Sequence, residues 1–391
     1  MHRPLRSPRT PHRHAISGVT LVELMVALGI GLALIAIMLS VYLSTSGASR
    51  RQEQISSIQN SVRVAFEYLA SDARMIGHEG CNTRATLPAS VENLDKDAGA
   101  APLAYNFGVG VEGWNFVTPD NALTLGGDTP ADDPDVGQFE ESKGAAIHVI
   151  PLTTISATGL TPGSDVLVMR SVTGRPIRLT AAAPIGNAAR IENVADGTCP
   201  GGTTAKVSGF CQNSYGLIAG CASAQYFRVQ SIATDTVTLT TTANLAKAYD
   251  TTAEVFPAQT VVYYVRLGSN GTSPSLYRRT FDGTSDAGLE EELIAGVESL
   301  QVRYGLDTTV PPDHNRDGDY VTASEIENWS NVVAVRMSLL LRSDTVADSS
   351  LTLPTSTPMN GLTITYPAGG ARFDRRVFTT TVALRNKVAF F

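Results

Sequence analysis

The chain has 391 residues, of which 43% are hydrophobic. That length exceeds one average domain, although a single all-β unit can be longer than about 200 residues. Acidic residues outnumber basic ones by 37 to 30, and the net charge of −7 argues against nucleic-acid binding through bulk electrostatics. No basic cluster in the sequence offsets that charge, so no nucleic-acid partner is predicted.

The first 18 residues form a basic segment. They contain four arginines and no acidic residue. Positive charge before an apolar helix keeps that end in the cytoplasm and sends the rest of the chain outward. If residues 1–18 were removed as a leader peptide, 26 basic residues would remain against 37 acidic ones, and the net charge would fall to −11.

An apolar run follows, from Leu24 to Leu43, and its twenty positions hold no charged residue. A helix of that length is about 30 Å long, which is enough to cross a bilayer. Glu23 stands at the front edge of this run. Because a carboxylate inside a membrane costs roughly 3 kcal/mol without a partner, an acid at this place predicts a function. An amino group created by cutting between Gly18 and Val19 would be the nearest partner.

The stretch SGVTLVELMVALGIGLAL, residues 17–34, resembles the class III signal of type IV pilins and of type II secretion pseudopilins. The resemblance implies that a membrane peptidase cuts after Gly18 and methylates the new N-terminus on Val19. It also implies that Glu23 pairs with the free amine of a neighbouring subunit when the helices bundle into a filament. Val19 replaces the phenylalanine or methionine that most members have there.

Two other interpretations of this segment remain open. An ordinary secretory signal could be cut near residues 45–48, where Thr, Ser, Gly and Ala cluster. Its apolar core would then exceed the roughly 7–15 residues of such signals. A plain membrane anchor would leave the acid at position 23 as an unexplained cost.

The helix is expected to continue to Gly77. No proline occurs between Val19 and Gly77, and glycine is a common helix terminator. Apolar residues recur at a spacing of three and four from residue 55 onward, which is typical of one buried helix face. We therefore predict a membrane-spanning half over residues 19–43 and an amphipathic half over residues 44–77 that packs on a folded head. The predicted buried face consists of Ile55, Ile58, Val62, Ala65, Leu69, Ala73 and Ile76.

Residues 78–143 are expected to form a loop-rich connection, because Gly, Pro, Asp and Asn are scattered among short apolar pieces. The letters GVGVEG, residues 108–113, match a dinucleotide-binding fingerprint. That fingerprint requires a strand before it and a helix after it, whereas Pro119 and no helical period follow here. We interpret the match as accidental.

From residue 144 to residue 391, strand patterns dominate and predict a β-rich globular head. The segments are rich in Val, Thr and Tyr and are separated by Gly, Asn and Asp. Several alternate between apolar and polar residues, which favours antiparallel sheets with one covered face. The predicted fold class is α+β and pilin-like, with a long N-terminal α-helix whose second half packs on a mostly antiparallel β-sheet head.

Four motifs in the body resemble the PilW family of minor pilins. They are SDARMIGHEGC (71–81), LYRRTF (276–281), LIAGVESLQVRYGLD (293–307) and RRVFTTTVALRNKV (375–388). The resemblance implies a minor pilin that primes pilus assembly, with a place in the tip complex as a further implication. The alternatives are a J-type minor pseudopilin of a type II secretion system and a membrane-anchored module that binds a surface.

A minor pilin of this kind would have several partners. They are the other minor pilins, the major pilin, the prepilin peptidase, the inner-membrane assembly platform, a tip adhesin and, before assembly, the lipid bilayer. The chain would cross the inner membrane once, with its head in the periplasm, and then join the pilus on the cell surface. This role requires no cofactor. Beyond residue 18 only His78, His148 and His314 remain as histidines, none in a catalytic motif, so no enzyme is predicted.

The four cysteines, Cys81, Cys199, Cys211 and Cys221, all follow the apolar run. An even number in an exported chain favours two disulfides, with three possible connectivities. A zinc site is disfavoured, because no C-x-x-C pair occurs. We favour Cys199 with Cys211, which leaves Cys81 with Cys221, although the sequence leaves the pairing open.

The stretch DHNRDGD, residues 313–319, has the oxygen donors of a calcium loop. Asp313, Asn315 and Asp317 fill the first three ligand positions of an EF-hand-like loop, and the carbonyl of Asp319 would follow. The closing carboxylate is Glu325, one residue beyond the expected position. Calcium in an irregular loop is therefore one hypothesis. An acidic surface turn is the other, because Asp, Asn and Gly commonly form turns.

Overall fold

The computed structural model describes residues 20–80, 82–83, 91–93, 102–116, 122–125, 139–140, 160–200, 205–233, 238–310, 312–347, 352–367 and 372–387. The chain divides into two compact units, residues 1–56 and residues 57–391.

Helix α1 runs from Leu21 to Met75 and contributes residues to both units. Its length confirms the prediction of one long N-terminal helix. Gly77 follows its end with φ +75°, the left-handed conformation that glycine adopts at low cost. From Ser57 on, the buried residues recur every three or four positions, with one adjacent pair at 69 and 70, as a single helix face requires. They are Ile58, Val62, Ala65, Leu69, Ala70 and Ala73.

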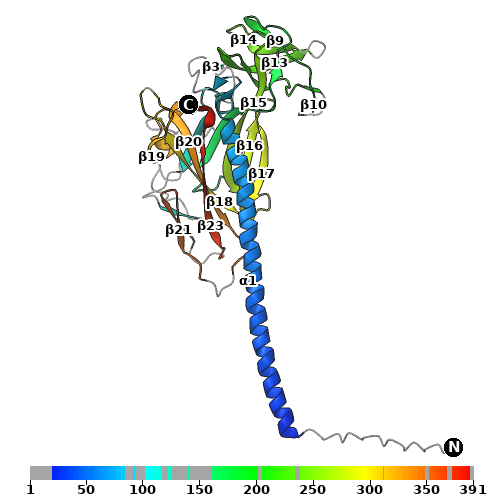
Figure 1. The fold of residues 1–391 in the computed structure, drawn as a ribbon, viewed down its shortest axis with the longest axis vertical. Helices are drawn as coiled ribbons and strands as arrows, with labels where there is room; N and C mark the ends of the chain where they lie inside the picture. Colours follow the sequence, from blue (N-terminus) through cyan, green and yellow to red (C-terminus); the bar gives the residue numbers. More distant parts are fainter. Residues whose placement is uncertain are drawn as a thin grey trace, which may run out of the picture. The chain divides into compact units, whose positions relative to one another are not determined.

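A mostly antiparallel sheet forms the larger part of the second unit (Figure 1). Its central strand, β15 (Glu254–Leu267), is buried over most of its length and pairs with β7, β12, β16 and β8. The other strands along its main path are β6 (Phe139–Glu140), β4 (Val111–Phe116), β7 (Val166–Val172), β12 (Tyr215–Ala219), β13 (Ala224–Ala233), β14 (Thr238–Leu245) and β9 (Gly186–Arg190). Beside this path lie β16 (Pro274–Phe281), β17 (Leu289–Ala295), β3 (Val91–Asn93) and β8 (Ile177–Arg178).

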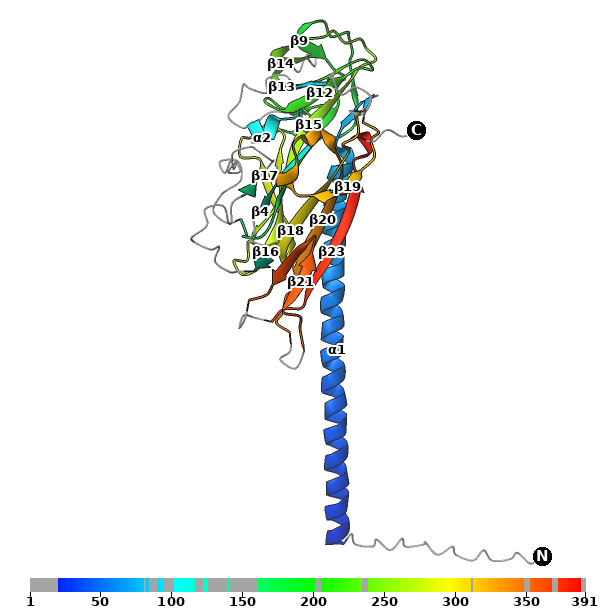
Figure 2. The ribbon, with the colours of Figure 1, turned by 90° about the vertical axis from the view of Figure 1, so that its left-hand side faces the viewer.

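A second sheet has four antiparallel strands in the order β19, β18, β20, β23. The part of α1 that belongs to this unit lies against the strands of the head (Figure 2). It shares one apolar core with both sheets, in which Leu69 of the helix, Tyr263 of β15 and Leu339 of β20 are all fully buried. This arrangement confirms the α+β fold class. The strands are β18 (Val297–Leu306), β19 (Asp317–Val321), β20 (Val332–Arg342) and β23 (Arg375–Ala383).

Short elements make up the remainder of the described residues. After α1 along the chain these include β1 (His78–Glu79), β2 (Asn82–Thr83) and α2 (Pro102–Tyr105). Two small sheets consist of β10 (Ala195–Thr198) with β11 (Ala205–Val207), and of β21 (Ser356–Met359) and β22 (Leu362–Thr365) with β5 (Ala122–Thr124). The 3-10 helices are η2 (Ala323–Glu325), η3 (Trp329–Asn331) and η4 (Arg385–Lys387).

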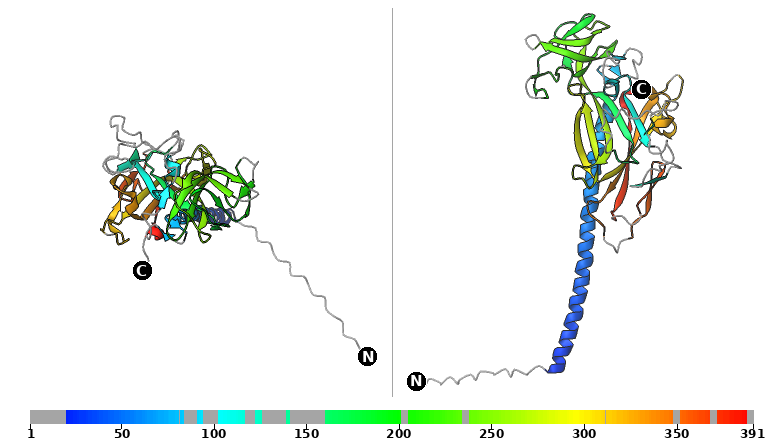
Figure 3. Two further views of the ribbon diagram at one scale, coloured as in Figure 1. Left: turned by 90° about the horizontal axis from the view of Figure 1, so that it is seen from above. Right: turned by 180° about the vertical axis from the view of Figure 1, so that it is seen from behind.

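Six strands of the principal sheet close into a small barrel. Strand β15 pairs with β12, β12 with β13, β13 with β14, and β14 with β9. The bridge between Leu179 and Ile191 and the pairing of β8 with β15 complete the ring. Apolar side chains such as Phe210, Phe227 and Leu239 fill the interior, so the barrel encloses a packed core. Its green strands form a group apart from the orange and red strands of the four-stranded sheet (Figure 3).

Strand β4 lies inside the interval that was predicted to be a loop-rich connection. It is largely buried and pairs with β7. A Cβ atom on Gly113 would collide with the hydroxyl group of Tyr304, and one on Gly110 would lie 2.8 Å from Ile76. Glycine therefore allows this strand to approach β18 and the end of α1 closely. Since Gly110 leads directly into this strand and Gly113 lies within it, their likeness to a nucleotide-binding fingerprint has a packing explanation.

Candidate assembly site on the N-terminal helix

Thr20 and Glu23 form the start of α1. The Thr20 Oγ1 atom accepts a hydrogen bond from the Glu23 N–H at 3.2 Å, and the Thr20 carbonyl accepts one from the Leu24 N–H at 3.1 Å. Thr20 is therefore the N-cap, and Glu23 is the third helical residue. The positive end of the helix dipole favours a carboxylate in this turn. The predicted cutting and methylation positions, Gly18 and Val19, lie outside the described residues.

An uncharged apolar surface follows Glu23 along α1. Every large apolar side chain from Leu21 to Leu43 is more than half exposed. By length and composition, α1 could cross a membrane, and no other helix in the described part of the chain could. Glu23 is the only charged residue in the helix before Arg50. Such an acid is suited to pair with a cation of another chain when this apolar surface becomes covered.

A polar cluster attaches the second half of α1 to the principal sheet. The Asp72 Oδ2 atom accepts hydrogen bonds from the Tyr263 hydroxyl at 2.6 Å and from the Arg278 Nε at 3.1 Å. Tyr263 and Arg278 lie on the neighbouring strands β15 and β16. The side chains of Asp72 and Arg278 are only 15% and 16% exposed, so the ion pair is largely shielded from solvent. Removing one member would leave a buried charge without its partner.

The pKa values in this cluster follow from burial and charge. Burial raises the pKa of the Tyr263 hydroxyl, and the neighbouring Asp72 carboxylate raises it further. Burial opposes the charged form of Arg278, but the attraction of Asp72 outweighs it, so the pKa of the guanidinium is raised. The hydroxyl therefore remains a donor and the guanidinium remains charged at physiological pH.

The end of the chain holds the end of α1. The Asn386 Nδ2 atom donates to the carbonyl groups of Arg74 at 3.1 Å and Ile76 at 3.2 Å. These bonds use carbonyl groups that a helix end leaves without intrahelical partners. The adjacent Lys387 is buried, and its Nζ donates to the Trp329 carbonyl at 3.2 Å. Helix η4 therefore connects the end of α1 to the entry of β20.

The predicted calcium ligands lie in one segment, but their carboxylates are directed to separate turns. Asp313, Asp317 and Glu325 each accept a hydrogen bond from a nearby backbone N–H, at 2.9, 2.7 and 2.7 Å. Asn315 is exposed in the turn before β19, and Asp319 is exposed on β19. Within the described ranges, no three His, Cys, Asp or Glu residues come together as metal ligands. Calcium binding by this segment stays a prediction.

A different acid orders this segment. Asp307 is 5% exposed, and its carboxylate accepts hydrogen bonds from the Thr309 N–H at 3.1 Å and the His314 N–H at 2.6 Å. His314 has φ +62°. The sequence pattern did not single out Asp307, because it lies six residues before the first calcium-like position and at the end of a strand.

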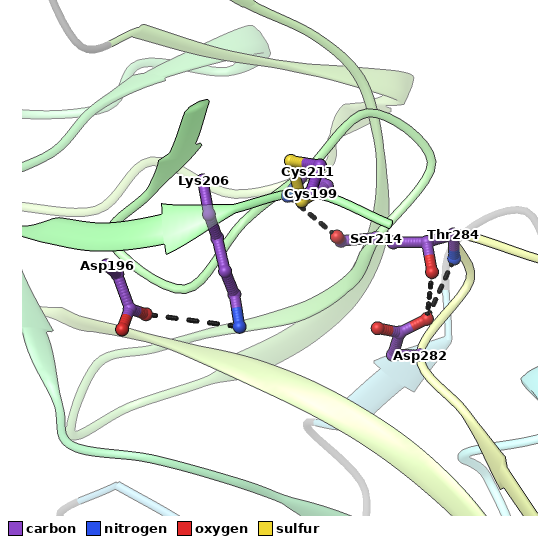
Figure 4. The surroundings of a disulfide bond; sticks show 7 residues. All are labelled: Asp196, Cys199, Lys206, Cys211, Ser214, Asp282 and Thr284. Atoms are coloured by element: carbon purple, nitrogen blue, oxygen red, sulfur yellow. Dashed lines mark hydrogen bonds and ion pairs between the residues drawn. A yellow bond between two sulfur atoms is a disulfide. The ribbon is translucent and has the colours of Figure 1, made fainter. Parts of the chain in front are cut away.

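Cys199 and Cys211 form a disulfide with a Cα separation of 5.8 Å, which is the pairing that the sequence favoured. It lies between the β10–β11 hairpin and the segment that leads into β12, where the Cys211 N–H donates to Ser214 Oγ at 2.8 Å (Figure 4). Cys221 is also disulfide-bonded. Cys81 lies outside the described residues.

A buried carboxylate joins the two sheets. Asp165 stands directly before β7 and is 3% exposed. Its Oδ1 accepts a hydrogen bond from the Phe116 N–H at the end of β4, at 3.0 Å, and its Oδ2 accepts one from the Val302 N–H of β18, at 2.8 Å. Burial raises the pKa of Asp165 to about 7, against the lowering effect of both hydrogen bonds and of the Arg303 charge. This carboxyl group therefore changes its charge near neutral pH.

The free energy of unfolding is expected to decrease as the pH rises from 5 to 7.5. The pKa of Asp165 is about 7 in the folded chain against an ordinary value of 3.8, so only the folded state keeps the proton at the start of this window, and it loses that proton as the pH rises through about 7. The contribution is about 2.5 kcal/mol. Denaturant unfolding of the wild type and of Asp165→Asn at both pH values measures it, because asparagine does not titrate. Equal pH slopes in the two proteins would contradict the prediction.

The similarity to known proteins lies in the part of the chain that contacts α1. A family model described as Type IV Pilus-assembly protein W matches residues 262–386. Over these residues the chain is similar to the PilW family. None of the curated proteins and none of the solved structures matches it.

The PilW match begins within β15 and ends in η4, so it includes the whole four-stranded sheet. Three residues that hold α1, namely Tyr263, Arg278 and Asn386, lie inside it. Asp72 lies outside it, on the helix itself. The other five strands of the barrel precede the match, and so do the residues of β15 that pair with β12 and β8. The PilW-matched region therefore supplies the polar groups that hold the helix, whereas Val111, Leu167 and Met169 of the shared apolar core precede it.

Asp72, Arg278 and Asn386, which attach the helix, lie in motifs that resemble PilW, but the sequence did not predict that they hold the helix. Asp72 belongs to SDARMIGHEGC, Arg278 to LYRRTF and Asn386 to RRVFTTTVALRNKV. The first two are separated by 206 positions, and Asn386 lies 312 positions after Arg74. The sequence held one signal of such a role, because each of these three motifs carries a polar residue next to apolar residues. Their meeting could not be derived from spacing along the chain.

Proposed function

We propose that this protein is a minor pilin of the PilW family that takes part in priming type IV pilus assembly. The family match supports a role in pilus assembly and contact with other pilus components. The observation that carries the finer proposal is Glu23 in the first turn of an apolar helix that has no other charge before Arg50. A plain anchor needs no acid at that position, whereas a subunit that pairs with the amine of a neighbour does.

In this proposal the chain is made as a prepilin with its head outside the inner membrane. Cutting after Gly18 gives a new amino group on Val19, which the peptidase methylates. The apolar half of α1 then leaves lipid for the filament core. There Glu23 pairs with the N-terminal amine of a neighbouring subunit, because two opposite charges in an apolar environment stabilise each other. The pairing also sets the axial position of the subunit.

The attachment of α1 to the head has a mechanical role in this proposal. A subunit drawn out of the membrane by its helix must carry its head along. The Asp72–Arg278 ion pair and the Asn386 hydrogen bonds hold residues 57–76 on the PilW-matched region. The helix and the head therefore move as one piece at this junction.

Replacement of Glu23 by alanine is expected to leave cutting after Gly18 intact and to reduce incorporation into pili at least about tenfold. An unpaired amine in the filament core would cost several kcal/mol, and each ~1.4 kcal/mol is a factor of ten. Mass spectrometry of the mature N-terminus would detect N-methyl-valine, and immunoblots of sheared pili would measure incorporation. Glu53→Ala is a matched control, because Glu53 is an exposed acid on the same helix.

The immunoblots test the pairing role of Glu23, and the mass of the mature N-terminus tests the assignment as a minor pilin. Wild-type incorporation of the Glu23 variant would reject the pairing role. A mature wild-type chain that begins near residue 49, without the apolar helix, would reject the minor pilin itself.

A further inference from the structure

Strand β23 is an outer strand of the four-stranded sheet. It pairs with β20 over nine successive positions, from Arg375 opposite Arg342 to Ala383 opposite Ala334, without a register shift. Among the described residues, no strand pairs with its other side. The strand therefore presents a long and regular edge.

The groups on that edge can be identified from the ladder. At its two ends the Leu384 N–H donates to the Val333 carbonyl, and the Ser343 N–H donates to the Asp374 carbonyl. Antiparallel pairs alternate between bonded and non-bonded positions. The even-numbered residues of β23 therefore bond to β20, and the N–H and C=O groups of Val377, Thr379 and Thr381 point outward. No residue in the described part of the chain forms a hydrogen bond with these outward backbone groups.

Other edges in this unit carry features that oppose strand addition. Strand β17 has three successive glutamates, 290–292, and a register shift against β16. Strand β19 has five residues, two of them aspartates, and a register shift against β18. Charges, bulges and short length are the usual protections of an edge. Strand β23 has none of them from Val377 to Leu384, where every residue is uncharged.

Positive charge lies beside this edge. Arg336 on β20 is placed over the ring of Tyr320 at 3.8 Å, and Arg316 approaches the same ring at 4.9 Å. The Arg336 Nε also lies 3.4 Å from the Thr381 Oγ1 of β23. Arg303 is directly opposite Arg336 in the sheet. Like charges on neighbouring strands destabilise a sheet unless a counter-charge is present.

The described residues supply little counter-charge. Arg303 lies 4.0 Å from Glu325, and neither Arg316 nor Arg336 forms an ion pair within the described ranges. An acidic side chain on a strand added beside β23, opposite Thr381, would reach the Arg336 guanidinium. The edge therefore suits an extended segment with acidic residues on one face.

We propose that β23 binds an extended, acidic segment of another pilus subunit, which continues the four-stranded sheet. Main-chain hydrogen bonds to Val377, Thr379 and Thr381 would give the affinity, and carboxylates facing Arg336 and Arg316 would give the selectivity. That the segment belongs to a pilus subunit rests on the proposed function. The binding of an acidic strand rests only on the edge and its arginines.

A peptide of seven alternating valine and glutamate residues tests the proposal on the full chain in detergent. It is expected to bind at least about tenfold more tightly than the valine and lysine peptide of the same length. Thr379→Pro should abolish binding, because it removes an outward N–H and leaves the backbone bonds to β20 in place. The hydrogen bond between the Thr379 Oγ1 and the Ser338 Oγ of β20 is lost in this variant and in Thr379→Val alike. Thr379→Val keeps that N–H and is the matched control. Thermal unfolding of both variants checks that the head remains folded.

The arginines are tested separately, so the proposal remains testable if the proline variant does not fold. An Arg316→Gln, Arg336→Gln double variant should lose the preference for the glutamate peptide, while Arg190→Gln, an exposed arginine on β9, should keep it. Equal binding of both peptides to the wild type would overturn the proposal. So would a dimer of the free chain in which the outward amides of β23 are already protected from hydrogen exchange. Binding of the peptide by a chain that never enters pili would reject the proposed function alone.

Discussion

Replacing Arg170 by methionine is expected to lower the free energy of unfolding by about 3–5 kcal/mol. Arg170 on β7 is 2% exposed, and its guanidinium donates to the carbonyls of Leu103 and Val109 and to the carboxylate of Glu112. Methionine would fill most of the volume but would leave a buried carboxylate and two carbonyls without their donor. Unfolding in guanidinium chloride, monitored by tryptophan fluorescence, measures the change in the free energy of unfolding, since Trp114 lies on the neighbouring strand β4.

A double variant separates the ion pair from the packing. Glu112→Leu in the Arg170→Met background removes the stranded charge and should recover part of the lost stability. Arg175→Met is the control for the substitution itself, because Arg175 is exposed. A loss below about 1 kcal/mol in Arg170→Met would show that the buried carboxylate finds other compensation.

Replacing Asp72 by alanine is expected to cost about 2–4 kcal/mol and to loosen the second half of α1 from the sheet. The change would leave the Arg278 charge largely buried and the fully buried Tyr263 without its acceptor. Hydrogen exchange of residues 57–75 should become faster, while the barrel strands should keep their protection. Exchange measured by mass spectrometry on the full chain in detergent reports both regions.

Glu67→Ala is the matched control for Asp72→Ala. Glu67 is an exposed acid on the same helix, and its replacement should change stability by less than about 0.5 kcal/mol. If both variants showed the same exchange in α1, the ion pair with Arg278 would not be what holds the helix.

The helix illustrates what a local pattern can predict. Its extent follows from a continuous apolar run, the three-and-four spacing of residues 58–73 and the lack of proline, and each of these acts within a few turns. The predicted end at Gly77 lies two residues beyond Met75, where α1 ends. Strand existence was predictable in the same way, since alternation has a period of two residues.

The acidic segment after β18 illustrates what a local pattern misses. Oxygen donors at alternate positions suggested a shared ligand sphere for Asp313, Asp317 and Glu325. In the fold each carboxylate accepts from a different nearby N–H, and Asp307 orders the turn, while calcium binding by this segment stays a prediction. A carboxylate that has an adjacent backbone donor satisfies itself locally, and a ligand pattern in the sequence carries no information about that competition.

The sequence by itself determined the long helix, the acid at its start, the strand-rich head and the favoured Cys199–Cys211 pairing, because these depend on neighbours within about a dozen positions. Only the tertiary structure decided that six strands close into a barrel, that Asp72 meets Arg278, and that β23 is an outer strand. These contacts join segments up to several hundred residues apart. Which of many possible strand pairings forms depends on how the whole core packs, and chain spacing does not record it.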